Sequence, residues 1–255
     1  MKLFYRKSGQ GQPLIILHGL FGQCDNWNTL AKQFAENGFE VYCVDQRNHG
    51  LSPHSDVWNY QVMSEDILEL INDNQLQNVI LLGHSMGGKV AMQFAVDHEQ
   101  LLDKLIVVDI APKYYSMHHQ QVLEALQSVD FDKVKSRKEA EEILSKFISD
   151  FGTKQFLLKN LYWKTETELA WRFNLKVIVE QIENVGEALI TNTSCTVPAL
   201  FIRGEKSNYI LDEDIHSIQD IFPHFELTTI ADAGHWVHAE KPKEFFDFVI
   251  RFLKL

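Results

Sequence analysis

Ser85 lies in the sequence Gly83-His84-Ser85-Met86-Gly87, a G-x-S-x-G pattern whose chemistry is nucleophilic attack by the serine oxygen. An apolar, β-branched run at 78–82 precedes the pattern, and a helix-like segment at 89–95 follows it. A strand–turn–helix context of this kind holds the serine oxygen clear of the chain at a helix N-terminus, where the macrodipole favours developing negative charge. Alone, the pentapeptide also fits a chance glycine-rich turn, so the assignment depends on the groups that would act with it.

Two further motifs supply those groups. His235, in an A-G-H-W sequence after the expected strand 225–230, is a loop histidine that can take the serine proton near neutral pH. An H-G-L-F-G loop at 18–22 follows the apolar strand 14–17 and offers the backbone N–H of Leu20 to a tetrahedral oxyanion, partnered by the N–H of Met86. Together the three motifs predict a site built around a nucleophilic serine.

The elements around these motifs alternate between strand and helix. Short apolar strands are expected at 14–17, 40–45, 79–82 and 105–109, with amphipathic helices at 27–36, 64–74 and 89–97 between them. This alternation predicts an α/β fold, with a mostly parallel twisted sheet flanked by helices. Sites in such sheets lie at the carboxyl ends of the strands, where all three motifs fall.

A change of pattern divides the chain. From 113 to 195 the sequence shows helical periods and no convincing strand, and S-R-K-E at 136–139 reads as a capping box. The strand pattern resumes at 198–202. We therefore expect residues 1–112 and 196–255 to form the core, and residues 113–195 to form an inserted helical cap over the pocket.

Composition sets limits on partners and location. The chain has 255 residues, a net charge of −11 and a pI near 5.4, which argue against a nucleic-acid or anionic-membrane partner. We find no signal-peptide pattern and no apolar run of membrane-spanning length. Cys24, Cys43 and Cys195 lack C-x-x-C spacing, so they are expected to be reduced, buried hydrophobic residues in a cytoplasmic protein.

Several segments carry a family resemblance that spans essentially the whole chain. They are H-G-L-F-G at 18–22, D-Q-R-N-H-G-L-S at 45–52, G-H-S-M-G-G-K at 83–89, V-D-I-A-P at 108–112, Q-F-L-L-K at 155–159, W-R-F-N at 171–174 and G-H-W-V-H-A-E-K-P at 234–242. With these motifs the chain resembles the α/β-hydrolase superfamily, and within it the YbfF-type bacterial esterases. The resemblance implies hydrolysis of short-chain and larger acyl esters, with acyl-CoA thioesters among the proposed substrates.

The acid that would orient His235 needs a separate argument. Most relatives place it in a Gly-x-x-Asp turn after the strand that follows the cap, but here that turn ends in Ser207, which carries no charge. YbfF-type proteins look similar in having Asp at the end of the preceding strand, the place of Asp109, and Ser in the usual slot. We therefore expect Asp109 to be the acid and Ser207 to add a hydrogen bond, although Asp109 also fits a turn residue before Pro112. The alternatives are Glu205, Asp212 and Asp214.

Weaker signals concern the pocket wall. We expect Tyr209, Trp236 and His119 to contact the substrate. Tyr209 also fits an ordinary packed tyrosine. At the position of His119, YbfF-type proteins can carry a basic residue that anchors the substrate, so histidine is a departure there. The H-x-x-H pair of His235 and His238 has metal-like spacing but no third ligand cluster, so we expect local packing and no metal. His18 and His84 are interpreted as scaffold, and R-N-H-G at 47–50 as a turn that braces the pocket floor.

The sequence thus predicts a serine esterase or thioesterase that forms an acyl-enzyme through a Ser-His-Asp triad. We expect it to act on a small acyl ester or thioester as a monomer, without a cofactor. Two alternatives stay open: a C–C bond hydrolase or lyase on the same fold, and a ligand-binding homologue without catalysis. Haloalkane and epoxide hydrolases are disfavoured because both use Asp where this chain has Ser85.

Overall fold

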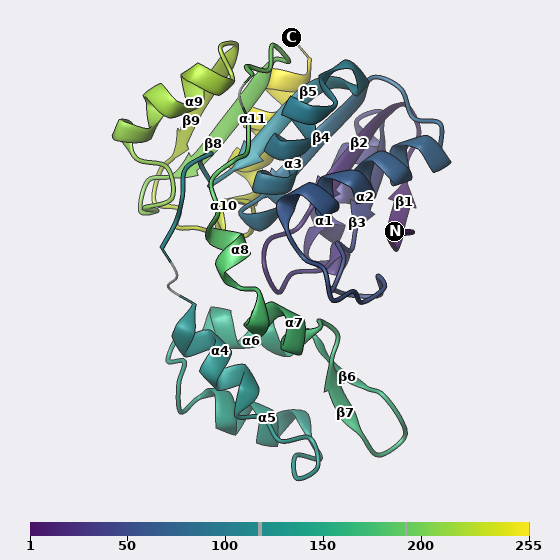
Figure 1. Ribbon diagram of the computed structural model, residues 1–255, viewed down its shortest axis with the longest axis vertical. Coiled ribbons are helices and arrows are strands. Elements are labelled where there is room, and N and C mark those ends of the chain that lie inside the picture. The colour runs from purple at the N-terminus through teal and green to yellow at the C-terminus, as the bar shows by residue number, and fades with distance from the viewer. Residues whose placement is uncertain (117–118, 192, 255) are drawn as a thin grey trace.

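A twisted sheet forms the centre of the computed structural model, which describes residues 1–116, 119–191 and 193–254 (Figure 1). Within this part of the chain the sheet has seven strands in the order β1-β3-β2-β4-β5-β8-β9. The strand β1 pairs antiparallel with β3, and the other neighbours are parallel. The bounds are β1 Tyr5–Ser8, β2 Gln12–Leu17, β3 Phe39–Val44, β4 Val79–His84, β5 Leu102–Val108, β8 Ala199–Gly204 and β9 Phe225–Ile230.

Helices cover both faces of the sheet, because the central strands are apolar on both sides. In β4, Ile80 and Leu82 pack in one buried cluster with α1 and α11, whereas Val79 and Leu81 pack in the other with α2 and α3. The mostly parallel sheet flanked by helices is therefore confirmed. The helices are α1 Asn28–Glu36, α2 Tyr60–Asp73, α3 Met86–Asp97, α9 Ile215–Ile221, α10 Val237–Glu240 and α11 Pro242–Leu253, with 3₁₀ turns η1 Cys24–Trp27, η2 Glu99–Leu101 and η3 Asp212–Asp214.

One helix of the core begins earlier than the sequence pattern predicts. The helix α2 begins four residues earlier than expected because the Asn59 side chain caps it, accepting a hydrogen bond from the backbone N–H of Val62 at 3.0 Å. The three cysteines are buried and form no disulfide with one another, as expected. Across 1–116, 119–191 and 193–254, no helix combines the length and the apolar character needed to cross a bilayer.

The segment between β5 and β8 projects from the carboxyl ends of the strands as a separate layer (Figure 1). It contains α4 Gln120–Gln127, α5 Arg137–Leu144, α6 Phe151–Leu158, β6 Leu161–Trp163, β7 Leu169–Trp171, α7 Leu175–Glu180 and α8 Glu183–Gly186. The expectation of no strand here was wrong, since β6 and β7 form an antiparallel hairpin. Three-residue strands are too short to show a period of two, and that is why the sequence pattern missed them.

The start of α5 forms only half of the expected capping box. The Ser136 hydroxyl accepts a hydrogen bond from the backbone N–H of Glu139 at 3.2 Å, as expected. The Glu139 carboxylate, however, accepts from the backbone N–H of Lys135 at 2.8 Å instead of from that of Ser136. The helix therefore has its N-cap, while the reciprocal bond is displaced by one residue.

The outgoing and returning chains of this segment run side by side. The backbone N–H of Tyr115 donates to the carbonyl of Gly186 at 2.8 Å, and that of Leu189 donates to the carbonyl of Pro112 at 2.9 Å. The ammonium of Lys89, a fully buried residue of α3, donates to the carbonyls of both Lys113 and Glu187. Both connections are thus fastened to the helix that begins at the predicted nucleophile.

Candidate active site

Ser85 lies in a strained turn between β4 and α3. Its φ is 53° and its ψ is −118°, a backbone conformation that a non-glycine residue rarely adopts. The flanking glycines are needed because the backbones come together here. A Cβ on Gly83 would lie 2.1 Å from the carbonyl oxygen of Gly87, and one on Gly87 would lie 2.6 Å from that of His18. The G-x-S-x-G sequence therefore folds as the expected elbow, with Ser85 at its apex.

His235 bridges Ser85 and Asp109. Its Nε2 lies 3.0 Å from the Ser85 Oγ, and its Nδ1 lies 2.8 Å from the Asp109 Oδ2. A carboxylate only accepts hydrogen bonds, so Nδ1 carries the proton and Nε2 is left to accept from the serine hydroxyl. Although these residues are far apart in the sequence, the ends of β4 and β5 and the loop after β9 bring them together.

The Asp109 carboxylate is fully buried and receives several hydrogen bonds. Besides the His235 ring, the Ser207 hydroxyl donates to its Oδ2, and the backbone N–H of Gly204 donates to its Oδ1 at 3.1 Å. These donors compensate for the removal of the carboxylate from water. Ser207 therefore occupies the position expected of it, beside the His235–Asp109 pair.

The alternative acids are engaged elsewhere. The Asp212 carboxylate pairs with Arg203 at 2.8 Å, and the Asp214 carboxylate pairs with Lys113 at 2.7 Å. The Glu205 carboxylate accepts from the backbone N–H of Asp232 at 2.8 Å. The carboxylate that the fold brings to His235 is that of Asp109.

The H-G-L-F-G loop lies against the serine. A Cβ on Gly19 would lie 3.3 Å from the Cβ of Ser85. The Gly19 carbonyl accepts from the backbone N–H of Gly22 at 2.9 Å and from the Nδ1–H of His18 at 2.8 Å, which fixes the plane of the Gly19–Leu20 peptide. Within the described residues, the N–H groups of Leu20 and Met86 donate no hydrogen bond, so both are available to donate to an anionic oxygen.

Buried neutral histidines form the scaffold around this centre. The His18 Nε2 accepts from the backbone N–H of Gln46 at 3.0 Å, and burial lowers the pKa of His18 to about 4. The His84 Nε2 lies 2.9 Å from the carbonyl of His235, and burial, then the nearby His238 and His235, lower the pKa of His84 well below its usual value.

His238 packs against Trp27. Its ring stacks on Trp27 at 4.1 Å, and burial lowers its pKa to about 3. No group of three or more potential metal ligands occurs among the residues described.

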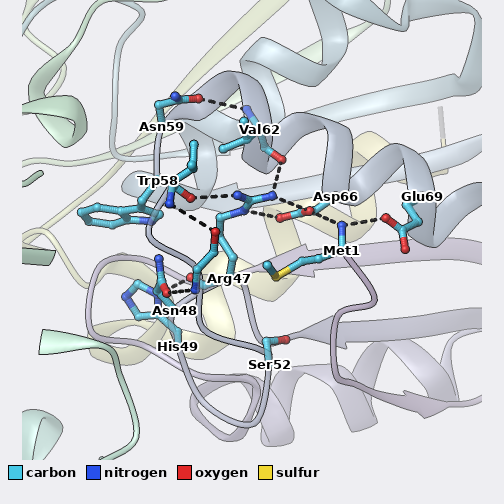
Figure 2. Close-up of polar contacts among 12 residues, drawn as sticks. Met1, Arg47, Asn48, His49, Ser52, Trp58, Asn59, Val62, Asp66 and Glu69 are labelled. Atoms are coloured by element: carbon cyan, nitrogen blue, oxygen red, sulfur yellow. Dashed lines mark hydrogen bonds and ion pairs between the residues drawn. The ribbon is translucent and has the colours of Figure 1, made fainter. Parts of the chain in front are cut away.

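The R-N-H-G turn is held by a buried ion pair between Arg47 and Asp66 (Figure 2). The Arg47 Nε lies 2.5 Å from one Asp66 oxygen and an Arg47 terminal nitrogen lies 2.7 Å from the other, while the guanidinium also donates to the carbonyls of Val57 and Val62. The ammonium of Met1 lies 2.5 Å from Asp66. A buried pair of this kind costs about 3–5 kcal/mol to break by removing one partner, so the turn is firmly held.

A cavity of about 110 Å³ opens onto the serine and the histidine. Both the core and the 113–195 segment contribute to its wall. The main contributors are Leu20, Trp27, Tyr209 and Trp236 from the core, and His119, Val122, Phe156 and Leu157 from the segment. A second cavity of about 20 Å³ also touches Ser85. All three residues predicted to contact substrate therefore lie on the wall.

Tyr209 is held directly against the histidine. Its ring lies 3.9 Å from that of His235 at an interplanar angle of 19°. The hydroxyl of Tyr115 donates to the Tyr209 carbonyl and accepts from the backbone N–H of Ala111 at 2.8 Å. Burial raises the pKa of the Tyr209 phenol to about 12, so the phenol is neutral at physiological pH.

Sequence reasoning missed three residues that support the site: Lys89, Tyr115 and Asn160. Lys89 carried a signal, because it is the one cation of a helix whose other residues, apart from Gln93 and Asp97, are apolar or glycine. Burial lowers its pKa to about 7. Tyr115 and Asn160 gave no sequence pattern. Tyr115 contacts Tyr209, 94 residues away, and Asn160 contacts the Phe21 carbonyl, 139 residues away.

Comparisons with known proteins identify the family of this fold. A family model described as alpha/beta hydrolase fold matches residues 12–136. Over 253 residues the chain is 38% identical to the sn-1-specific diacylglycerol lipase ABHD11 of Danio rerio, covering 96% of this chain and 80% of that protein. Over 243 residues it is 36% identical to Esterase YbfF of Escherichia coli K12, covering 94% and 92%. A solved structure of a marine microorganism esterase matches with a TM-score of 0.96 and 44% identity, over 99% of both chains.

Identity at this level over nearly the full length of both chains shows common ancestry and a common fold. The expected resemblance to YbfF-type esterases is thereby confirmed. The chain belongs to the α/β-hydrolase family, and it is a hydrolase enzyme.

Proposed function

We propose that the protein hydrolyses carboxylic esters, with Ser85 as nucleophile, His235 as general base and acid, and Asp109 as the carboxylate that orients the histidine. The observation that carries this proposal is the simultaneous contact of one imidazole with the Ser85 Oγ at 3.0 Å and the Asp109 carboxylate at 2.8 Å. This is the arrangement in which a serine hydroxyl loses its proton as it attacks.

The acylation step uses groups of this chain only. The Ser85 Oγ attacks the ester carbonyl carbon while its proton passes to the His235 Nε2. The carbonyl π electrons move to oxygen, and the N–H groups of Leu20 and Met86 stabilise that oxyanion. Collapse of the tetrahedral intermediate expels the alcohol, which takes the proton from His235, and leaves an acyl group on Ser85.

Water then releases the acyl group. His235 takes a proton from a water molecule as the water oxygen attacks the acyl carbon, and returns the proton to the Ser85 Oγ when the second intermediate collapses. Asp109 stabilises the imidazolium in both steps, and Ser207 supports the Asp109 charge through its hydroxyl. The products are one carboxylic acid and one alcohol.

The proposed substrate is a small acyl ester or thioester with an apolar group. We assign residues 113–195 as a cap on a core of 1–112 and 196–255, because His119, Val122, Phe156 and Leu157 bring the cap to the cavity. Tyr209, Trp236 and His119 would contact the substrate there. The names of the relatives, a diacylglycerol lipase and esterases, support an ester over the C–C bonds of the alternative chemistry.

A substrate panel tests the proposal. Purified protein is assayed with p-nitrophenyl esters, acyl-CoA thioesters, a diacylglycerol and a C–C cleavage substrate, and is labelled with a fluorophosphonate that is located by peptide mass spectrometry. We expect ester turnover, labelling of Ser85, and loss of both in Ser85→Ala with an unchanged melting temperature. Labelling of another serine, or turnover of the C–C substrate alone, would contradict the proposal.

A further inference from the structure

Phe21, in the middle of the H-G-L-F-G loop, adopts a backbone conformation that it does not favour. Its φ is 60°, in the left-handed region, where a bulky side chain is strained. Residues held in this region persist only when the surroundings over-determine them. The contacts around Phe21 therefore decide whether the loop keeps its shape.

Hydrogen bonds hold three successive peptide groups of this loop, and the third, Phe21–Gly22, is held both from within the loop by the Gly22 N–H and from the cap by Asn160. The Gly19–Leu20 peptide is fixed through the Gly19 carbonyl, within the loop itself. The Phe21 N–H donates to the His49 Nε2 at 3.2 Å, and His49 is neutral because burial lowers its pKa to about 3. The Phe21 carbonyl accepts from the Asn160 Nδ2 at 2.8 Å. The first two partners belong to the core, but Asn160 belongs to the cap.

Asn160 is buried and oriented so that its amide nitrogen faces the loop. It is 1% exposed and lies between α6 and β6, where its own carbonyl accepts from the backbone N–H of Arg172 at 2.8 Å. Its Nδ2 faces two carbonyls, those of Phe21 and Leu157, so the amide nitrogen and not the oxygen must point toward the loop. The ring of Phe21 also packs against Phe173 of the cap at 5.1 Å.

We propose that Asn160 is a positioning residue for the oxyanion site: the cap, through Asn160, holds the loop that presents the Leu20 N–H. The proposal rests on the proposed function, since it assigns the loop its role in ester hydrolysis. The oxyanion site is then complete only when the cap is seated on the core. Asn160 touches no reacting atom and acts through Phe21.

The chain offers a matched control for this contact. The Asn184 Nδ2, in α8 of the same segment, donates to the carbonyl of Trp58 in the core at 2.7 Å. The residue type, the donor atom and the kind of acceptor are the same as for Asn160. Trp58 lies outside the oxyanion loop, so Asn184→Ala removes a bond between cap and core while leaving Phe21 held.

Amide hydrogen exchange tests the structural part without reference to turnover. In full-length Asn160→Ala we expect peptides covering 18–24 to exchange about 10-fold faster or more than in the wild type, since a loop that opens more often loses protection. In Asn184→Ala these peptides should exchange as in the wild type. Equal exchange in Asn160→Ala and the wild type would overturn the proposal.

Kinetics test the functional part. In Asn160→Ala we expect kcat for p-nitrophenyl acetate to fall about 10- to 100-fold, the range for misplacement of a catalytic group through its support. KM should change little, because the substrate pocket is retained. The inhibition constant of a trifluoromethyl ketone, whose adduct with Ser85 carries an oxyanion, should rise by the same factor as kcat falls. Asn184→Ala should leave both values close to those of the wild type.

Other outcomes decide the case as well. A rise in KM with kcat unchanged, or equal losses of kcat in both variants, would overturn the positioning role. Asn160→Leu, of similar shape, removes the donor without burying a charge and should reproduce the Asn160→Ala effects; a wild-type kcat in that variant contradicts the proposal. A wild type that hydrolyses no ester would refute the proposed function, while the exchange experiment would still decide whether Asn160 holds the loop.

Discussion

Three donors converge on the buried carboxylate of Asp109: the His235 ring, the Ser207 hydroxyl and the backbone N–H of Gly204. They differ in what they do for catalysis. The Gly204 and Ser207 bonds hold the carboxylate, whereas the His235 bond sets which ring nitrogen carries the proton. Substitutions at these positions should therefore have unequal effects.

Asp109→Asn should lower kcat by about 10³–10⁴, because the amide offers an N–H to the His235 Nδ1 and favours the wrong tautomer. Ser207→Ala removes one hydrogen bond to a charged group, worth about 1.5–3 kcal/mol, so it should cost about 10- to 100-fold. Steady-state kinetics on one p-nitrophenyl ester measure both.

Asp212→Asn provides the control for this pair. Asp212 is exposed and pairs with Arg203, so activity should stay close to that of the wild type. A large loss of kcat in Asp212→Asn together with a small loss in Asp109→Asn would mean that the acid comes from the loop after β8.

At the scale of elements, the helices α4 and α6 of the 113–195 segment line the 110 Å³ cavity. Val122 comes from α4, and Phe156 and Leu157 come from α6. The aromatic ring of Phe156 lies 5.5 Å from that of Trp236 in the core. A larger side chain on α4 should therefore shorten the space for an extended acyl group without altering the triad.

Val122→Trp should reduce kcat/KM for p-nitrophenyl octanoate by about 10-fold or more, since one or two lost methylene contacts alone are worth about 1–3 kcal/mol. The value for p-nitrophenyl acetate should change much less. Phe151→Ala, on the exposed side of α6, is the control, and the ratio of the two substrates should be unaltered there. An unchanged ratio in folded Val122→Trp would show that the cap does not set chain length.

The elements that could be predicted from sequence are those with a local signal. The turn at Ser85 was predictable because two glycines, a strand run and a helix run adjoin it in the chain. The hairpin β6–β7 was not, because three-residue strands show no period. The choice of Asp109 over Asp212 and Asp214 rested on a resemblance, because all three follow a strand at the same edge and only the packing of the side chains separates them.

The supporting residues were hidden for a related reason. Asn160 acts on Phe21 across 139 residues, and an asparagine between a helix and a strand is ordinary in sequence. Tyr115 acts on Tyr209 through a carbonyl, which any residue could provide. A contact to a backbone group does not constrain the residue type of the partner, so the sequence gives no sign of it.

At the scale of the whole molecule, stability depends on pH through buried histidines with lowered pKa values, four of which lie among the described residues. Burial is the main cause in His18, His49, His84 and His238, so each stays neutral in the folded protein below the usual histidine range. In the unfolded chain each binds a proton near pH 6.5. The unfolded state therefore binds more protons below pH 6.5, and stability is lost as the pH falls from there toward 4.

His238→Phe tests this linkage. Phenylalanine keeps the stacking on Trp27 but does not titrate. We expect the fall in the free energy of unfolding between pH 7 and pH 5 to be smaller than in the wild type by about 1–2 kcal/mol. Urea unfolding at the two pH values measures it. His216 is exposed, so in His216→Gln the free energy of unfolding should fall between the two pH values as much as in the wild type. An equally large fall in His238→Phe would show that the His238 ring is not neutral in the folded protein.

The chain segments that lead out to the 113–195 segment and back from it lie side by side, joined by backbone hydrogen bonds. Because the chain leaves the core and re-enters it at hydrogen-bonded neighbours, a lid of another length or shape can be transplanted there without rerouting any strand. The core places two demands on such a graft: Lys89, whose buried ammonium uses a carbonyl from each connection, and the Phe21 carbonyl, which takes its donor from Asn160. A graft must supply both acceptors or arrive with an apolar residue in place of that lysine. Substrate preference can thus change by exchange of one segment, provided that the new segment also supplies a donor to the Phe21 carbonyl.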